Sequence, residues 1–379
     1  MASAEGLTAV EVASHMVLGG SLIANSINTD AEDPVKSLEA EILIKLQSGD
    51  CYVSFSGGRD SSTILATGAR VAKAHRLRPP VPVTLRFASD PASHESEWQD
   101  GLVNSLGLDD WKVIDMEHDL ELLGPWAERS IREFGLTFPS NAYLHMPMFE
   151  FARGATLMTG LDGDGLFGSW RWRSHSAIRN RQRKPRPREI PGMVHAMMPA
   201  GMRAAIGHVN GKMDIHWLKE PFRSRLRKQW VDEVSREPSH WARWVEWFAG
   251  RRYLTLATSS LQRLASLSDT RVVHPFLSQR FLSSIAAKAA PGGFGNRTEA
   301  MKMLFGGVVP DEILERSSKA RFVSSLWGPK TRQFIQDWDG SGIDVAVIDE
   351  QALREEWANT EPNFATSLLV QQAWLASIR

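Results

Sequence analysis

Residues 54–62 of the chain read Ser54-Phe55-Ser56-Gly57-Gly58-Arg59-Asp60-Ser61-Ser62. They overlap the end of a short apolar run with strand propensity, Cys51–Phe55, and the start of Ser61–Ala74, where apolar side chains recur at helical spacing. Two adjacent glycines let backbone N–H groups close around an anion, and a helix that begins directly after them adds donors and a positive dipole end. A lone Gly-Gly is usually a plain turn with a serine N-cap. Here the order of strand, loop and helix favours a phosphate-binding loop.

This loop differs from the two most familiar nucleotide loops. It lacks the Gly-Lys-Ser/Thr of the Walker loop and the Gly-x-Gly-x-x-Gly of dinucleotide-binding folds. Asp60 has the carboxylate that could hold a magnesium ion against phosphate oxygens. We predict that a nucleotide is bound by seven residues of this loop and by Phe87 at the end of the next strand. The loop residues are Ser54, Ser56, Gly57, Gly58, Asp60, Ser61 and Ser62.

Strands and helices alternate around this loop. We expect strands at Cys51–Phe55, Val81–Ala88, Trp111–Met116 and Ala155–Gly160, and helices at Val35–Leu46, Ser61–Ala74, His94–Leu106, Leu120–Phe134 and Asn141–Arg153. Such alternation predicts an α/β fold with a doubly wound, mostly parallel sheet. Beyond Trp170 we find no convincing strand. Trp, Arg and Leu recur there at helical spacing, so we expect a largely helical second half packed by tryptophans.

Composition narrows the class of protein. The 379 residues include 44 Lys+Arg and 44 Asp+Glu, one cysteine and 42% hydrophobic residues. This balance excludes a mainly disordered chain, and one cysteine excludes an intramolecular disulfide framework or a cysteine-rich metal site. The uncharged run Val12–Thr29 is broken by polar residues and glycines, so it is a poor membrane span. We expect a cytoplasmic protein without a membrane partner.

The zero net charge hides a local asymmetry. Residues 89–133 hold 12 acids and 3 bases, whereas Arg171–Arg188 holds 8 bases and no acid. We divide the chain into an N-terminal helical extension (1–34), a nucleotide-binding α/β core (35–170), a basic mobile loop (171–190) and a helical, substrate-side region (191–379). The basic loop is expected to order over substrate, or to dock an acidic leader peptide or carrier protein.

The pattern Ser-Gly-Gly-x-Asp-Ser at residues 56–61 resembles the pyrophosphate-binding loop of the PP-loop ATP pyrophosphatases. Three later segments resemble asparagine synthetases in particular. The family's Ser-Gly-Glu-Gly-x-Asp-Glu-x-Phe-Gly is similar to Thr159-Gly160-Leu161-Asp162-Gly163-Asp164-Gly165-Leu166-Phe167-Gly168. Its Val-Pro-Phe-Leu-Asp-x-Arg-Phe is similar to Val273-His274-Pro275-Phe276-Leu277-Ser278-Gln279-Arg280-Phe281. Its terminal helix and loop, ending in Lys-x-x-Phe, resemble residues 297–322, which end in Lys319-Ala320-Arg321-Phe322.

The resemblance implies roles for individual residues. Asp60 and Asp164 would bind magnesium and bridge it to the triphosphate of ATP, and the Gly160 backbone would lie close to the nucleotide. Lys319 would neutralise charge on the α-phosphate and on the oxyanion of the acyl-adenylate. The predicted catalytic residues are therefore Lys319, Asp60 and Asp164. Taken singly, an Asp-Gly turn and a solvated lysine are the ordinary interpretations. We expect His274 and Phe276 to serve packing rather than chemistry.

Two departures from the family limit the comparison. Asparagine-forming members have a glutamate, and β-lactam synthetases a tyrosine, where this chain has Leu161, which cannot handle an attacking amine. The base that deprotonates the amine must then be another residue or the substrate itself, or the amine must arrive in its neutral form. His94, Glu95 and Glu97 lie after the second expected strand and are candidates, although they read equally well as exposed helix residues.

The second departure concerns the amine donor. Asparagine synthetases begin with a glutaminase domain whose nucleophile is an N-terminal cysteine, whereas this chain begins Met1-Ala2-Ser3 and its one cysteine, Cys51, falls in an expected strand. Residues 7–20 resemble the tail that ends that domain. We therefore do not expect this chain to make ammonia from glutamine.

The resemblance implies an ATP- and magnesium-dependent amide synthetase that uses a carboxylate and an amine from a small-molecule or peptide substrate. Similar reactions are those of β-lactam synthetases and of lasso-peptide macrolactam synthetases, and residues Trp241–Trp247 are a candidate surface for a peptide. Three alternatives stay open. One is a PP-loop enzyme that binds and modifies RNA through Arg171–Arg188, although we see no cysteine pair or RNA module and do not expect a nucleic acid partner. The others are an ammonia-using subunit with a separate glutaminase and a non-catalytic subunit.

Overall fold

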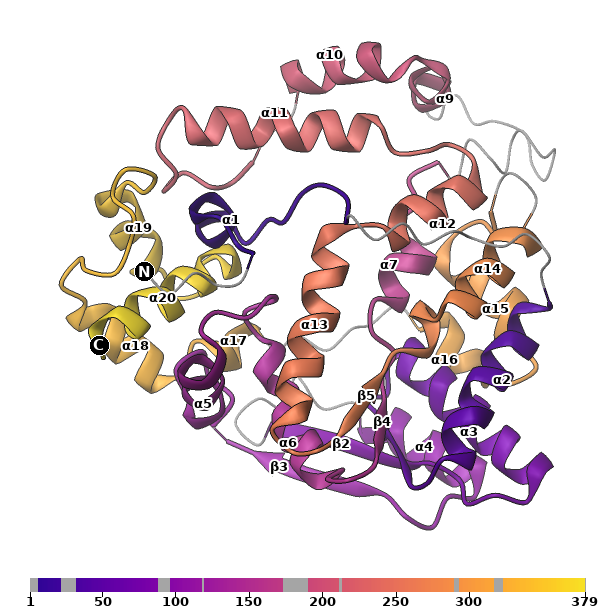
Figure 1. Ribbon diagram of the computed structural model, residues 1–379. Coiled ribbons are helices and arrows are strands. Elements are labelled where there is room, and N and C mark those ends of the chain that lie inside the picture. Colours follow the sequence, from indigo (N-terminus) through magenta and orange to yellow (C-terminus); the bar gives the residue numbers. More distant parts are fainter. Residues whose placement is uncertain are drawn as a thin grey trace.

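The computed structural model describes residues 6–21, 32–87, 96–117, 119–172, 190–210, 213–289, 293–316 and 323–378. Its centre is a sheet of five parallel strands in the order β3-β2-β1-β4-β5 (Figure 1). The predicted α/β class is confirmed. The strands are β1 (Cys51–Ser54), β2 (Val81–Phe87), β3 (Lys112–Met116), β4 (Thr156–Met158) and β5 (Arg271–Val273).

The fifth strand corrects the expectation that no strand follows Trp170. β5 pairs in parallel with β4, with Thr156 opposite Arg271 and Met158 opposite Val273. The strand has only three residues and comes shortly after the helix α13 (Arg252–Ser266), so it is too short for an alternating pattern to register. The helical half of the chain thus supplies one edge of the sheet.

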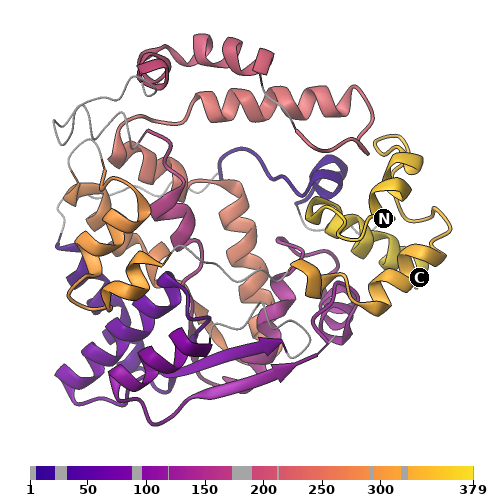
Figure 2. The same ribbon diagram turned by 180° about the vertical axis from the view of Figure 1, so that it is seen from behind.

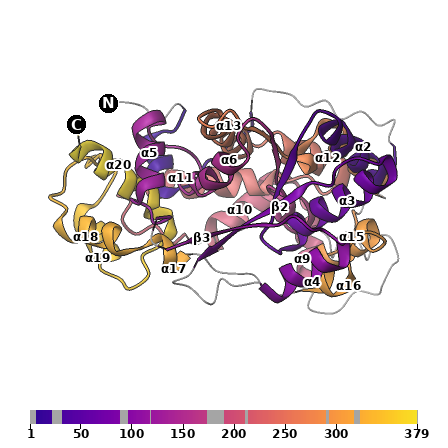
Figure 3. The ribbon, with the colours of Figure 1, turned by 90° about the horizontal axis from the view of Figure 1, so that it is seen from below.

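Helices cover both faces of the sheet, as the doubly wound prediction requires. Val53 and Phe55 pack in the cluster formed with α2 (Pro34–Gln47), α3 (Arg59–His75) and α4 (Ser96–Leu106). Tyr52 and Leu157 point to the opposite face, where they pack with α6 (Met146–Phe151) and α13. Successive residues of a strand face opposite sides, which is why Val53 and Tyr52 separate in this way. Figure 3 shows α6 and α13 on one side of β2 and α4 on the other.

Two further groups of helices lie outside the sheet. One group packs around a separate apolar cluster in which Val12 and Ala13 of α1 lie against Leu368 and Leu369 of α20, at one end of the molecule in Figures 1 and 2. The other runs across the top of Figure 1 through α9, α10 and α11. The elements not yet given are α1 (Ala9–Ser14), α5 (Pro125–Phe134), η2 (Ala142–His145), α7 (Gly163–Gly168), α9 (Ile190–Met197), α10 (Ala200–Asn210), α11 (Phe222–Ser235), α12 (Trp241–Ala249), η4 (Pro275–Leu277), α14 (Gln279–Lys288), α15 (Arg297–Phe305), α16 (Asp311–Glu315), α17 (Val323–Leu326), α18 (Pro329–Asp337), α19 (Glu350–Trp357), η5 (Phe364–Thr366) and α20 (Ser367–Ser377).

Tryptophans pack the helical half, as expected. Trp241 and Trp244 stack with ring centroids 5.1 Å apart, and Phe248 continues the stack 5.3 Å from Trp244. Because positions 241, 244 and 248 share one face of α12, their rings are buried, and Trp241 and Trp244 are only 3% and 1% exposed. The hypothesis that Trp241–Trp247 holds a peptide is therefore wrong for these two residues. Trp247 lies on a different face and is half-buried.

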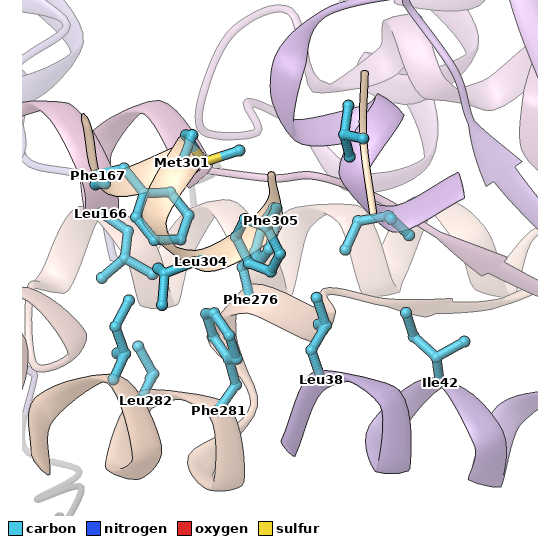
Figure 4. Close-up of a cluster of buried hydrophobic side chains, with 14 of the residues drawn as sticks. Leu38, Ile42, Leu166, Phe167, Phe276, Phe281, Leu282, Met301, Leu304 and Phe305 are labelled. Atoms are coloured by element: carbon cyan, nitrogen blue, oxygen red, sulfur yellow. The ribbon is translucent and has the colours of Figure 1, made fainter. Parts of the chain in front are cut away.

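A cluster of aromatic rings fixes the elements that carry the site. Phe167 of α7 meets Phe276 of η4 edge-on at 5.5 Å and Phe305 of α15 at 6.1 Å. Figure 4 shows these rings above Leu38 and Ile42 of α2. Phe276 is fully buried, in agreement with the expected packing role. Within the described ranges no helix has the length and apolar character needed to cross a membrane.

Candidate active site

The candidate site lies at the carboxyl edge of the sheet, where β1 and β4 end side by side. The chain leaves β1 into the loop that begins α3, and it leaves β4 into the turn that begins α7. Successive connections from β1 and from β4 run to opposite sides, so this is a switch point of the strand order. Open α/β sheets bind ligands in the crevice at such points.

The loop itself is closed by its own serines. Ser61 Oγ donates to the Gly58 carbonyl at 3.1 Å and lies 3.2 Å from Ser56 Oγ, while the Gly58 N–H donates to Ser56 Oγ at 3.3 Å. Gly57 has φ 80°, a conformation that favours glycine. Gln99 of α4 donates to the Ser56 carbonyl at 3.0 Å and so fixes the outer side of the loop.

The first turn of α3 has no side-chain cap, so its backbone N–H groups remain suited to an anion. The other residues predicted to bind nucleotide lie at different depths. Ser54 ends β1 and is half-buried, whereas Ser62 is fully buried and its hydroxyl has no hydrogen-bond partner among the described residues. Phe87 ends β2 and packs with Met116 and Leu120.

The turn before α7 touches the first turn of α3. A Cβ added to Gly160 would lie 2.9 Å from the backbone nitrogen of Ser61, and one added to Gly163 would lie 2.6 Å from Asp60 Cγ. Only glycine allows this approach without a shift of the neighbouring chain. Asp60 therefore lies directly beside the turn that carries Asp164, which is exposed in the first turn of α7.

Three arginines surround the loop. Arg297, the first residue of α15, donates to Asp60 Oδ2 at 2.6 Å. Arg59 donates to Thr298 Oγ1 at 3.0 Å and also to the Arg316 carbonyl, and Arg316 donates to the Gly57 carbonyl at 3.2 Å. Burial lowers the pKa of Arg59 from its ordinary value, and the neighbouring Arg297 lowers it as well. Such an excess of cations around one carboxylate suits a polyanionic ligand.

These residues fit ATP and magnesium. The glycine loop, the uncapped helix start and the arginines would hold phosphate oxygens, and Asp60 and Asp164 would hold the metal. Magnesium is usually bound through one or two carboxylates together with substrate phosphates, so two carboxylates suffice. The described residues contain no group of three His, Cys, Asp or Glu side chains placed to hold a metal ion.

Asp162 and Tyr253 form a second feature of the site. The Tyr253 hydroxyl, from α13, donates to Asp162 Oδ2 at 2.6 Å, and Asp162 has φ 55°. Burial raises the pKa of Asp162, against the opposite effect of the Tyr253 hydrogen bond, and nearby Asp164 raises it further. Burial and Asp162 likewise raise the pKa of Tyr253. Leu161 packs against the apolar cluster that covers the sheet.

Thr159 and His274 join the ends of β4 and β5. Thr159 Oγ1 accepts from the Leu161 N–H at 3.2 Å and lies within hydrogen-bond distance of His274 Nδ1, 2.7 Å away. Burial, with the neighbouring His145, lowers the pKa of His274 to about 4. The ring is therefore neutral at pH 7, and its hydrogen bond with Thr159 has a structural role in this turn.

A cavity of about 740 Å³ lies beyond Tyr253. It is bounded by the N-terminal segment, by α11 and by Trp247 and Arg251. The Arg251 guanidinium lies 4.5 Å from the Trp247 ring and 5.9 Å from the Tyr253 ring, and it forms an ion pair with Glu233. Arg251 thus stands between the cavity and the Tyr253–Asp162 pair.

Several predicted residues lie outside the described residues: Lys319, His94, Glu95 and residues 173–188 of the basic loop. Glu97 is described and exposed on α4. Sequence reasoning missed Arg297, Arg316, Tyr253 and the pairing of Asp162. The change of the family's glycine to Asp162 was a signal for that last residue.

No curated protein matches the chain. The model of the family described as asparagine synthase matches residues 47–376. The chain therefore belongs to the asparagine synthase family of ATP-dependent amide synthetases.

Proposed function

We propose that this protein activates a substrate carboxylate as an acyl-adenylate and joins it to an amine carried by the substrate, as in macrolactam or β-lactam formation in natural-product biosynthesis. The observation that carries the proposal is the close approach of the turn before α7 to Asp60, beside the arginine-surrounded loop. It gathers anion-binding groups and two carboxylates at one edge of the sheet.

The two steps balance as follows. A carboxylate oxygen forms a bond to the α-phosphorus of ATP while the bond from that phosphorus to the bridging oxygen breaks, and pyrophosphate leaves with the electron pair. The amine nitrogen then bonds to the acyl carbon, the carbon–oxygen bond to AMP breaks with its pair on AMP, and the proton lost by the neutral amine passes to solvent.

Each group of residues supports one of these reaction steps. The loop and its arginines suit pyrophosphate, which carries most of the developing negative charge. Magnesium, held by Asp60 and Asp164, would supply further charge neutralisation. Lys319 is proposed to meet the α-phosphate and the acyl oxygen.

The cavity beside Arg251 supports a peptide-like substrate rather than a free amino acid. At about 740 Å³ it lies within the usual range of ligand pockets and exceeds what an aspartate needs. Its charged side chains cancel, with Glu11, Asp232 and Glu233 opposite Arg225, Arg236 and Arg251. A neutral, partly apolar cavity suits a peptide segment.

Isotope exchange between labelled pyrophosphate and ATP tests the proposal. Short peptides with a free N-terminal amine and an internal Asp or Glu are supplied as the carboxylate, with free aspartate as a separate arm. We expect exchange with at least one peptide class, AMP release and loss of one water from that peptide by mass. Exchange with aspartate alone, followed by ammonia-dependent asparagine formation, would favour the ammonia-using alternative. Absence of exchange with every acid would refute the proposal.

A further inference from the structure

We propose that Tyr253, held in place by Asp162, receives the attacking amine, a role that rests on the proposed function above. The position that handles the amine in the relatives is Leu161 here, and its side chain packs against the apolar cluster over the sheet. A leucine offers no acceptor to an N–H group. The next residue, Asp162, accepts a hydrogen bond from the Tyr253 hydroxyl.

Two departures from the family pattern are coupled in space. The family has glycine and glutamate where this chain has Asp162 and Gly165. A Cβ added to Gly165 would lie only 2.5 Å from Asp162 Oδ1. The Asp162 carboxylate thus fills the space that a side chain at 165 would need.

The backbone conformation at Asp162 indicates a functional reason for an aspartate in place of glycine. Its φ of 55° and ψ of 19° lie in the left-handed region, which glycine adopts freely and which costs most other residues free energy. Aspartate tolerates the region better than most, but glycine is still the easier residue there. Residues kept in such conformations cluster at functional sites. A carboxylate in place of glycine is therefore explained by what it binds.

The hydrogen bond fixes the direction of the Tyr253 hydroxyl. Because its proton is donated to Asp162 Oδ2 at 2.6 Å, the lone pairs of its oxygen remain for another donor. None of the described residues donates to that oxygen. An amine brings N–H donors in either protonation state, so it complements this oxygen. Asp162 acts through Tyr253 and is a positioning residue.

The location matches the two halves of the reaction. Asp162 comes two residues after Gly160, whose backbone touches the phosphate loop at Asp60 and Ser61. On the other side, the Tyr253 ring contacts Arg251, which lines the cavity assigned to the peptide. An amine held at Tyr253 lies between the activated carboxylate and the rest of the substrate.

The test separates adenylation from amine capture. A peptide with a free N-terminal amine and an internal Asp or Glu, the class proposed above, is the probe for wild type and Tyr253→Phe. Pyrophosphate–ATP exchange reports adenylation, and loss of one water by mass reports amide formation. We expect Tyr253→Phe to keep exchange within about twofold and to lower the kcat of amide formation by about 10- to 100-fold.

A matched control is available among the three tyrosines of the chain. Tyr52 lies in β1 with its ring edge-on to Phe151 at 5.4 Å, on the face of the sheet covered by α6. Tyr52→Phe removes the same hydroxyl away from the site and should leave both rates unchanged.

Variants at Asp162 test the positioning role. Asp162→Asn keeps an oxygen acceptor for the hydroxyl and tolerates the left-handed backbone, so it should retain most amide formation. Asp162→Gly relieves the backbone but removes the acceptor. It should lower amide formation about tenfold while exchange and the unfolding temperature stay near wild type. A merely structural Asp162 would instead lower stability in both variants, with exchange and amide formation falling together.

The outcomes distinguish the two levels of the proposal. Absence of exchange in wild type with every peptide refutes the proposed function. Exchange in wild type together with full amide formation in Tyr253→Phe overturns the role of Tyr253 alone. Equal losses of exchange and amide formation in Tyr253→Phe would also overturn it, because the tyrosine would then serve adenylation.

Discussion

The two sides of the site hold charge in opposite ways. On the nucleotide side, defined as residues 54–62 with Asp164, Arg297 and Arg316, the three arginines outnumber the two aspartates, and one ion pair and several arginine hydrogen bonds connect the elements. On the amine side, defined as Asp162, Tyr253 and Arg251, burial raises the pKa of both members of the hydrogen-bonded pair. The nucleotide side suits a polyanion, and the amine side suits an N–H donor.

This difference teaches how one edge of a sheet can serve two half-reactions. Anion binding needs many donors and tolerates their spread over α3, α15 and the loop. Amine binding needs one acceptor with a fixed direction, and in our proposal the single hydrogen bond from Tyr253 to Asp162 provides it. Variants on the nucleotide side should therefore abolish both exchange and amide formation, whereas variants on the amine side should separate them.

The largest effect is expected from Asp164→Asn. An amide oxygen binds magnesium more weakly than a carboxylate, so exchange and amide formation should both fall by about 1000-fold. Asp110→Asn, which removes a carboxylate paired with Arg78 on the surface, is the control and should have no effect. Unchanged turnover in Asp164→Asn would refute its assignment to the metal.

Arg297→Ala should have the next largest effect. It removes a cation from the nucleotide side and releases Asp60 from its 2.6 Å hydrogen bond. We expect the KM for ATP in the exchange assay to rise by about 30-fold, a loss typical of charged hydrogen bonds. Arg297→Lys should restore only part of the affinity for ATP, because lysine keeps the positive charge but lacks the paired N–H donors of the guanidinium group. A larger effect on amide formation than on exchange would contradict the division into two sides.

Gly165→Ala sharpens the amine side. Its Cβ would lie 2.5 Å from Asp162 Oδ1, so the variant should lower the free energy of unfolding by about 1–2 kcal/mol. In an Asp162→Gly background the same change should cost almost nothing. Chemical denaturation of the four proteins gives the coupling energy. Equal costs in both backgrounds would show that the two positions are independent.

The smallest effect concerns His274, which hydrogen-bonds Thr159 where β4 and β5 end. Its folded pKa of about 4 is below the ordinary 6.5, so the unfolded chain binds more protons between these values. The stability that its neutral form contributes is complete above pH 6.5 and is lost as the pH falls toward 4. His274→Asn should therefore reduce the pH dependence of unfolding by at most about 1.4 kcal/mol per pH unit in that window. Urea unfolding at pH 7, 6 and 5 measures it, and an unchanged slope would contradict the assignment.

Local sequence explains why the nucleotide loop was predictable. Ser56, Gly57, Gly58 and Ser61 are contiguous and lie between a strand and a helix whose patterns are clear. The alternation of strands and helices likewise indicated a mostly parallel sheet that contains the first four strands. β5 was missed because three residues give no alternating pattern, and because β4 rather than its own neighbours holds it in place.

The amine side was hidden for a different reason. Asp162–Asp164 can be read as an ordinary Asp-Gly turn, and nothing in the sequence near Tyr253 indicates that α13 brings its hydroxyl to that turn. Arg297 was seen only as part of a family-like segment. Pairing across distant elements depends on tertiary packing, of which the Phe167, Phe276 and Phe305 rings that join α7, η4 and α15 are one example (Figure 4).

The origin of β5 also has a consequence for biosynthesis on the ribosome. Until residues 271–273 have emerged, β4 has an open edge and the Met158 and Thr159 end lacks its pairing with Val273. Contacts between segments so far apart in sequence form late and expose strand edges meanwhile. The first half of the chain, expressed alone, should therefore aggregate rather than fold, and chaperones should be needed until the second half arrives.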